Sequence, residues 1–327
     1  MPTWCEHMNT TYAMENLTLA TTHSCYAVYS VEKRLILFFY LSVIIIAIPS
    51  NTFSLYVSWQ YIMQKNELGV YLFNLALSDL AFTIGLCLWL NFFWRGVWAY
   101  GGYVCLLSVN MVLTNYYTSD ALLCCIAVNR YLAVVHPLKY TFVRKVGTAA
   151  VVSIVIWVLV LCFNATTITW EDTYYENNKF STCFDFYLLP SDRSAWTKVA
   201  RFFLAFIIPL LLVVLSTLGI CEAVKSNQAT EKQERKRILK LLTVILVCHV
   251  LFLGPTHIMM LLSILVQDCS NIPWLFWLEE ISVAISSLNC LMDPLLYCFI
   301  TEKGKANVNQ VVLFFQVKKR SKDGGLV

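Results

Sequence analysis

Charge is what this sequence lacks most. Asp, Glu, Lys and Arg make up 13% of its 327 residues, whereas soluble domains carry about 25%. The formal net charge is only +4, and the basic residues are scattered between apolar blocks, which argues against nucleic-acid binding. Hydrophobic residues account for 58% of the chain, and the mean hydropathy is +0.64. So little charge is explained if most of the protein surface faces lipid.

Motifs for catalysis and for metal binding are also lacking. The sequence has no HExxH, no GxSxG and no glycine-rich phosphate loop, so nothing in it indicates an enzyme. Its thirteen cysteines form no CxxC pair and no cluster with histidine, which argues against a zinc site. We therefore predict that the protein is not an enzyme and needs no organic cofactor.

Seven apolar stretches are present, each long enough to cross a bilayer, which takes roughly 20 helical residues. They lie near residues 34–61, 68–93, 102–134, 147–169, 196–224, 238–266 and 274–300. The sequence therefore predicts an all-α membrane protein, a seven-transmembrane helix bundle. Residues 1–31 contain no apolar run of the signal-peptide type, so we expect the first span to direct the chain to the membrane.

The basic residues favour one orientation of this bundle. Lys and Arg accumulate in cytoplasmic segments of membrane proteins. Most of them fall on the inner side if the N-terminus is extracellular: Lys65, Arg130, Lys139, Arg144, Lys145, Lys225, Lys232, Arg235, Lys236, Arg237, Lys240, Lys303, Lys305, Lys318, Lys319, Arg320 and Lys322. Glycosylation sequons at Asn9 and Asn16 agree with an extracellular N-terminus. We expect a multi-pass protein of the cell membrane.

This orientation divides the chain into three parts. We expect an extracellular N-terminal segment (1–31), a seven-transmembrane domain (32–300) and a cytoplasmic tail (301–327). In the tail, residues 302–316 have the pattern of a short amphipathic helix lying on membrane lipid. This would be an eighth helix.

Polar residues inside the spans are few and patterned. Those near the middle of the second, third and seventh spans are Asp79, Asn115, Ser119, Asp120, Asn289 and Asp293. Asn115 and Ser119 are four residues apart, as are Asn289 and Asp293, so each pair shares one helix face, which must point into the bundle. These oxygen-rich side chains suit a hard cation such as sodium, with Asp79 as the central ligand. A hydrogen-bonded network with protonated Asp explains them equally well.

The fifth, sixth and seventh spans carry prolines at Pro209, Pro255 and Pro294. Each removes a backbone hydrogen bond and can kink its helix. Kinked helices around a polar centre indicate a bundle that can rearrange.

An ordered set of motifs along these spans resembles the rhodopsin-like (class A) G-protein-coupled receptors. The matching residues are Asn51 in IPSN, Asp79 in LALSDL, Trp98 before Cys105, Asn129-Arg130-Tyr131 in NRYLAVVHPL, Trp157, Pro209, Pro255 in GPTH, and Asp293, Pro294 and Tyr297 in DPLLY. The resemblance implies coupling to a heterotrimeric G protein. It assigns the switch to Asn129, Arg130, Tyr131, Pro255, Asp293, Pro294 and Tyr297, and a sodium site to the polar residues around Asp79.

Longer stretches resemble the proton-sensing subgroup, which overlaps receptors for lysolipids. They are ELGVYLFNLALSDL, CCIAVNRYLAVVHPLKY, TEKQERKRILKLL and SLNCLMDPLLYCF. The resemblance implies two disulfides, Cys105–Cys183 and Cys25–Cys269. The resemblance also implies extracellular protons as the agonist, and histidine, which titrates near neutral pH, is the natural sensing group. The candidates for pH sensing are His23, His257, Arg201, Glu279, Glu280, Glu171 and Asp172.

Two other functions stay open. A lysolipid or lysosphingolipid agonist could place its phosphate on Lys198 and Arg201. A proton-coupled transporter is a more distant alternative, because the sequence shows no internal repeat of the transporter type.

The chain departs from the family pattern at several switch positions. Asn129 replaces the usual acid, His249 a phenylalanine, Leu253 a tryptophan and Thr217 a tyrosine. Asn129 can offer Arg130 only a neutral hydrogen bond, so we predict raised basal activity that Asn129→Asp lowers.

A further departure concerns buried acids. The subgroup's glutamate in the fourth span is Val160, whereas Asp120 is an added acid in the third span. Asp120 either replaces the lost titratable group or is hydrogen-bonded locally.

Overall fold

The computed structural model describes the backbone of residues 14–95, 98–136, 138–170, 174–177, 180–183, 192–226, 232–265 and 272–300. Side chains are described, with gaps, from Leu35 to Leu296. The predicted eighth helix at residues 302–316 lies outside this part, as do Asn9, Glu171, Asp172 and Cys269 and the side chains of Asn16, His23, Cys25, Cys183 and Tyr297.

The first four helices are continuous. They are α1 (Met14–Met63), α2 (Glu67–Arg95), α3 (Gly101–Val135) and α4 (Val146–Trp170). An antiparallel hairpin follows, with β1 (Tyr174–Asn177) paired to β2 (Phe180–Cys183) so that Tyr174 lies opposite Cys183. The hairpin is an addition to the expected helices.

The fifth and sixth spans each consist of two α-helices joined by a π-helical turn. The fifth comprises α5 (Asp192–Phe202), η1 (Phe203–Ile207) and α6 (Ile208–Ser226), and the sixth comprises α7 (Lys232–Cys248), η2 (His249–Leu253) and α8 (Gly254–Leu265). Pro209 and Pro255 are each the second residue after the π turn. Each proline removes one backbone hydrogen bond from its span, and the irregular π turn stands at the place where that bond is missing.

The seventh span is broken rather than continuous. α9 (Ile272–Ser286) and α10 (Asn289–Ile300) are separated by a turn at Ser287 and Leu288. The apolar span predicted near 274–300 therefore consists of two helices joined by this turn. The six other spans are long and apolar enough to cross a membrane within the described residues: Leu35–Met63, Glu67–Arg95, Gly101–Val135, Val146–Thr167, Ala195–Ala223 and Lys236–Leu265.

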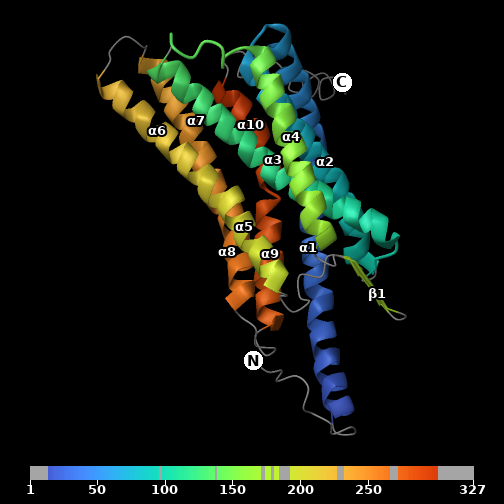
Figure 1. The fold of residues 1–327 in the computed structure, drawn as a ribbon. Coiled ribbons are helices and arrows are strands. Elements are labelled where there is room, and N and C mark those ends of the chain that lie inside the picture. Colours follow the sequence, from blue (N-terminus) through green and yellow to red (C-terminus); the bar gives the residue numbers. More distant parts are fainter. Residues whose placement is uncertain are drawn as a thin grey trace, which may run out of the picture.

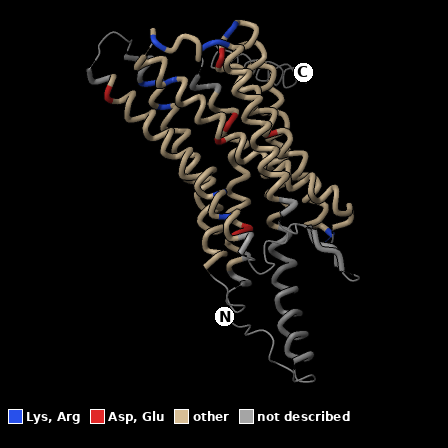
Figure 2. Tube along the Cα trace, in the orientation of Figure 1, with Lys and Arg blue, Asp and Glu red and all other residues tan. Residues whose placement is uncertain are grey.

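The spans form an elongated bundle, with the hairpin at one end (Figure 1). α3 lies at its centre and contacts α2, α4, α6, α7 and η1. Figure 2 shows Lys and Arg gathered at the end away from the hairpin. We call this the basic end; its described cations include Lys65, Arg130, Lys139, Arg144, Lys145, Lys236, Arg237 and Lys240.

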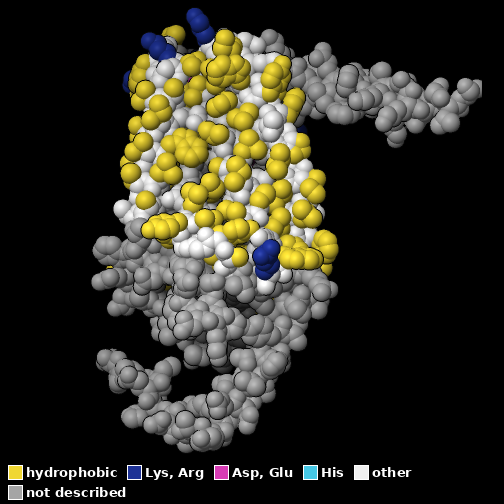
Figure 3. Space-filling view, turned by 90° about the vertical axis from the view of Figure 1, so that its right-hand side faces the viewer, with side chains coloured by type: hydrophobic (Ala, Val, Ile, Leu, Met, Phe, Trp, Pro, Cys, Tyr) yellow, Lys and Arg dark blue, Asp and Glu magenta, His cyan; other side chains and the backbone are white. Residues whose placement is uncertain are grey.

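The sides of the bundle are apolar. Phe38, Ile45, Ile154 and Leu159 are among the exposed large hydrophobic side chains. Figure 3 shows such side chains covering one face as a broad belt. In water a belt of this size would drive aggregation, whereas in a bilayer it contacts lipid chains. The belt confirms the transmembrane bundle predicted from composition.

Gly69 lets α1 and α2 approach closely. A Cβ at this position would lie 2.7 Å from Tyr61 Cβ, 2.8 Å from Ile62 N and 2.9 Å from Ser58 O. Two of these atoms belong to the backbone and cannot rotate away. Only glycine fits this contact, which fixes the start of α2 against the end of α1.

We expect Gly69→Ala to lower the midpoint of thermal unfolding in detergent. Overpacking of a close contact costs about 1–3 kcal/mol. Gly147→Ala is the matched control, because a Cβ there meets nothing within 4 Å and alanine stabilises a helix by roughly 0.5–1 kcal/mol. Equal midpoints for the two variants would contradict the tight contact at Gly69.

Candidate functional site

α3 carries three groups of polar residues, which we call the first, second and third level. The first is Asn115 and Ser119 near the middle of the helix, the second is Asp120, the next residue along the chain, and the third is Arg130 at the basic end. An α-helix rises 1.5 Å per residue, so Asp120 and Arg130 are about 15 Å apart along one rigid element.

The first level is a buried polar cluster around Asp79. The Asn115 amide donates to Asp79 Oδ1 at 2.8 Å and to Ser119 Oγ at 3.2 Å, and the hydroxyls of Ser78 and Ser119 are 3.1 Å apart. Asp79 Oδ2 is buried and has no hydrogen-bond partner among the described residues. An unpartnered carboxylate oxygen in such a place fits either a bound cation or a proton.

The break in the seventh span sets the position of Asn289 and Asp293. Asn289 begins α10, and its amide nitrogen lies 3.5 Å from Asp293 Oδ2. Pro294 has no N–H, so the Cys290 carbonyl loses its intrahelical donor. The Asn51 side chain of α1 supplies one instead, at 2.9 Å. Both pairs predicted from the four-residue spacing, Asn115 with Ser119 in α3 and Asn289 with Asp293 in α10, are therefore in contact.

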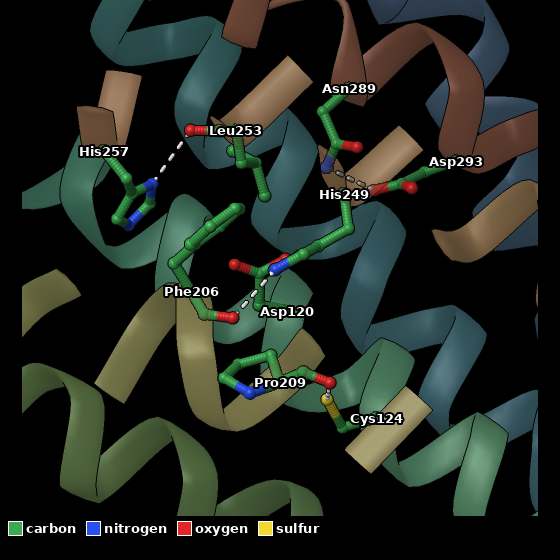
Figure 4. Close-up of polar contacts among 9 residues, drawn as sticks. All are labelled: Asp120, Cys124, Phe206, Pro209, His249, Leu253, His257, Asn289 and Asp293. Atoms are coloured by element: carbon green, nitrogen blue, oxygen red, sulfur yellow. Dashed lines mark hydrogen bonds and ion pairs between the residues drawn. The ribbon is translucent and has the colours of Figure 1, made fainter. Parts of the chain in front are cut away.

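The second level is a contact that the sequence did not reveal. Asp120 Oδ1 lies 3.1 Å from His249 Nδ1 of η2, and the two side chains are 2% and 5% exposed. His249 Nε2 lies 3.1 Å from the Phe206 carbonyl oxygen. A carbonyl oxygen can only accept, so Nε2 carries a hydrogen. The contact links α3 to both the fifth and the sixth span (Figure 4).

This geometry requires one more proton on the pair. With Nε2 protonated, His249 Nδ1 approaches Asp120 favourably only if it donates as imidazolium or accepts from a protonated carboxyl group. An ionised Asp120 facing the lone pair of a neutral imidazole would be repelled. The Asp120–His249 pair is therefore a buried proton-holding contact.

His257 lies on the other side of the Phe206 ring. The ring stacks on His249 at 5.1 Å and on His257 at 5.3 Å between centroids. His257 Nδ1 donates to the Leu253 carbonyl at 2.9 Å, while its Nε2 is buried with no hydrogen-bond partner among the described residues. His257 is thus packed inside the described part of the bundle, with 3% of it exposed.

The cations near the hairpin end are engaged within the protein. Arg201 is buried and donates from Nη2 to Thr167 Oγ1 at 2.7 Å. Lys198 Nζ donates to Ser263 Oγ at 2.9 Å. Glu279 of α9 is buried and Glu280 is partly exposed. Of the predicted pH-sensing residues whose side chains the structure describes, Arg201, His257 and Glu279 are thus buried in the bundle, and Glu280 is partly exposed.

The start of α3 is anchored near the hairpin. Cys105 is buried and disulfide-bonded. The hairpin strand β2, which ends at Cys183, contacts α3. This arrangement is compatible with the predicted Cys105–Cys183 bridge.

The third level lies around Arg130 at the basic end. Arg130 Nη2 donates to Asn129 Oδ1 at 3.2 Å and lies 3.4 Å from Glu67 Oε1. The ring of Tyr131 lies where a Cβ of Gly219 would be, so α6 passes close to this ring. The neutral hydrogen bond predicted between Asn129 and Arg130 is present. The ion pair between Arg130 and Glu67 was not predicted from the sequence.

Sequence reasoning missed Glu67 and the link between His249 and Asp120. His249 and Asp120 are 129 residues apart, and Arg130 and Glu67 are 63 apart. A signal existed in each case. His249 and Asp120 are both unusual polar residues in apolar spans, and Glu67 is an acid beside the basic inner segments.

Comparison with known proteins agrees with these features. The family described as "7 transmembrane receptor (rhodopsin family)" matches residues 50–297. G-protein coupled receptor 65 of Homo sapiens is 38% identical over 292 residues, covering 84% of this chain and 85% of the relative. G-protein coupled receptor 68 of Homo sapiens is 32% identical over 284 residues, covering 85% and 77%. Lysophosphatidic acid receptor 6 of Gallus gallus is 27% identical over 270 residues, covering 80% and 88%.

The match covers most of the spans and the three levels of α3. It confirms a multi-pass membrane receptor and not an enzyme. The chain belongs to the rhodopsin family of seven-transmembrane receptors.

Proposed function

We propose that this receptor responds to extracellular acidification and activates a heterotrimeric G protein. The observation that carries the proposal is the buried Asp120–His249 contact, whose geometry needs a bound proton. Histidine and carboxylate are the side chains that exchange protons in the physiological range when they interact. In this proposal the N-terminal segment (1–31) is extracellular, residues 32–300 form the membrane domain, and the tail (301–327) is cytoplasmic.

Proton binding at the pair changes how three spans are held together. With the proton, Asp120, His249 and the Phe206 carbonyl connect α3, η2 and η1. Without it, the contact between Asp120 and Nδ1 becomes repulsive. Protons therefore bind one packing of these helices better than another, which is the condition for a ligand to shift a conformational equilibrium.

Other titratable groups act on the same pair. His257 of α8, Asp293 of α10 and Cys124 of α3 interact electrostatically with Asp120. Asp293 also interacts with Asp79. In this proposal a sodium ion at Asp79, held with Asn115 and Ser119, adds positive charge and so opposes the protonation of the neighbouring acids.

The direct test is the signal of the receptor as a function of external pH. In cells that express it, we expect cAMP, calcium or Rho readouts to rise as the pH falls from about 8 to about 6, the range in which histidine titrates. Arg130→Ala is the control, because it removes the arginine assigned to the G-protein contact and should silence the signal at every pH. A flat response from a well-expressed receptor would rule out proton activation.

A lysolipid agonist is the second candidate, favoured by the similarity to lysophosphatidic acid receptor 6. Lys198 and Arg201 are the cations that would hold its phosphate. Both already bond to hydroxyl groups of the protein, and a phosphate would have to displace those bonds. Adding lysophosphatidic acid at constant pH distinguishes the two agonists, since only the lipid receptor would respond and lose the response in Arg201→Ala.

A further inference from the structure

Glu67, the first residue of α2, lies between two arginines at the basic end. Its Oε1 atom is 3.4 Å from Arg130 Nη2 and 4.0 Å from Arg144 Nε. The side chains of Glu67 and Arg130 are 10% and 19% exposed, whereas that of Arg144 is 43% exposed. Solvent screens an exposed ion pair more than a shielded one. The contact with Arg130 is therefore the stronger of the two.

The backbone holds Glu67 in this place from both sides. Asn66 Oδ1 accepts a hydrogen bond from Leu68 N at 3.0 Å, which is a helix N-cap, and Asn66 N donates to Tyr61 O at 3.0 Å. The close contact at Gly69 fixes the next turn. An acid in the first turn of a helix is also favoured by the helix dipole. Glu67 is thus fixed by the fold rather than placed by a flexible loop.

We propose that Glu67 is the positioning residue for Arg130, the arginine through which this receptor couples to its G protein. The residue beside Arg130 in the chain, Asn129, offers only a neutral carbonyl oxygen at 3.2 Å. The carboxylate comes instead from another helix, so Arg130 is held against the start of α2. Arg130 must leave Glu67 to become available, and Glu67 therefore sets the basal activity.

This contact changes what is expected of Asn129. The sequence alone predicts raised basal activity, because Asn129 is uncharged. With Glu67 in contact, Arg130 keeps a charge-assisted partner, so Asn129→Asp in the native protein should lower the baseline only slightly. The same substitution should have its full effect once the charge of Glu67 is removed. This non-additivity is the mark of two groups acting on one partner.

The test is a double-mutant cycle read as basal G-protein activation per receptor at the cell surface, at one alkaline external pH. Glu67→Gln keeps the shape and removes the charge, and we expect it to raise the baseline roughly three- to tenfold, as for a partly exposed charged hydrogen bond. Glu67→Gln with Asn129→Asp should return the baseline to within about twofold of the native receptor. The assay needs no agonist, so its result does not depend on proton activation.

Two further variants separate positioning from other roles. Arg144→Gln should raise the baseline by less than about twofold, because its contact is longer and more exposed. If Glu67→Gln fails to reach the surface, Glu67→Asp keeps the charge but withdraws it by one methylene, and should give a smaller rise. The proposal is overturned by an unchanged baseline in the expressed Glu67 variant, by no rescue from Asn129→Asp, or by an equal effect of Arg144→Gln.

Discussion

Replacing His249 by phenylalanine is expected to abolish most of the acid response while leaving the receptor folded. Phenylalanine has a similar shape and can keep the ring stacking on Phe206, which has a centroid distance of 5.1 Å. It removes both ring nitrogens, and with them the contact with Asp120 and the donor to the Phe206 carbonyl. A hydrogen bond to a charged group is worth about 1.5–3 kcal/mol, which is a factor of roughly ten to a hundred in an equilibrium.

The measurement is the ratio of G-protein signal at low and high external pH, corrected for surface expression. Asp120→Asn should reduce this ratio as strongly as His249→Phe, and the double variant should add little, because both remove the same proton site. His136→Phe is the matched control. His136 is an exposed histidine at the end of α3 that makes edge-to-face contacts with Tyr131 and Tyr140, and its loss should leave the pH dependence in place.

An unchanged pH midpoint in His249→Phe would mean that another residue senses the pH. His257→Phe then becomes the decisive variant, because its imidazole has a buried nitrogen that could take up a proton. A response lost only in the His257 variant would place the site on α8, on the other side of the Phe206 ring.

The seven spans could be predicted from the sequence because lipid imposes a simple rule on composition and length. The pairs within one helix could be predicted too, since a spacing of four residues fixes a shared face. The contacts between helices could not. Asp120–His249 and Glu67–Arg130 depend on the rotation and height of each helix relative to its neighbours, and apolar lipid-facing residues do not determine either of these.

The break in the seventh span is a backbone feature that also could not be predicted from the sequence. Pro294 indicates that a carbonyl four residues earlier lacks its donor, but not what replaces it. The replacement is Asn51, 239 residues away in the chain. Only the packing of α1 against α10 brings Asn51 and Cys290 together. Local sequence therefore predicts neither this bond nor the turn at Ser287 and Leu288.

Replacing Asn51 by leucine is therefore expected to destabilise the seventh span. Leucine fills a similar volume, but the Cys290 carbonyl would have no donor from either Asn51 or the proline. An unsatisfied buried acceptor costs about 1–3 kcal/mol, and more where water is excluded by lipid. The midpoint of thermal unfolding in detergent, followed with a thiol-reactive dye, should fall clearly. A midpoint equal to that of the native receptor would contradict this role of Asn51.

A second substitution tests the cause rather than the mere loss of a side chain. Pro294→Ala supplies a backbone N–H four residues after Cys290, so α10 can satisfy that carbonyl itself. The double variant Asn51→Leu with Pro294→Ala should regain at least about half of the lost stability. General damage to the packing of α1 would leave the double variant as unstable as Asn51→Leu. Rescue would show that Asn51 and Pro294 act together. The carbonyl of Cys290 that Pro294 leaves without a backbone donor accepts from Asn51, and this bond holds the seventh span to α1.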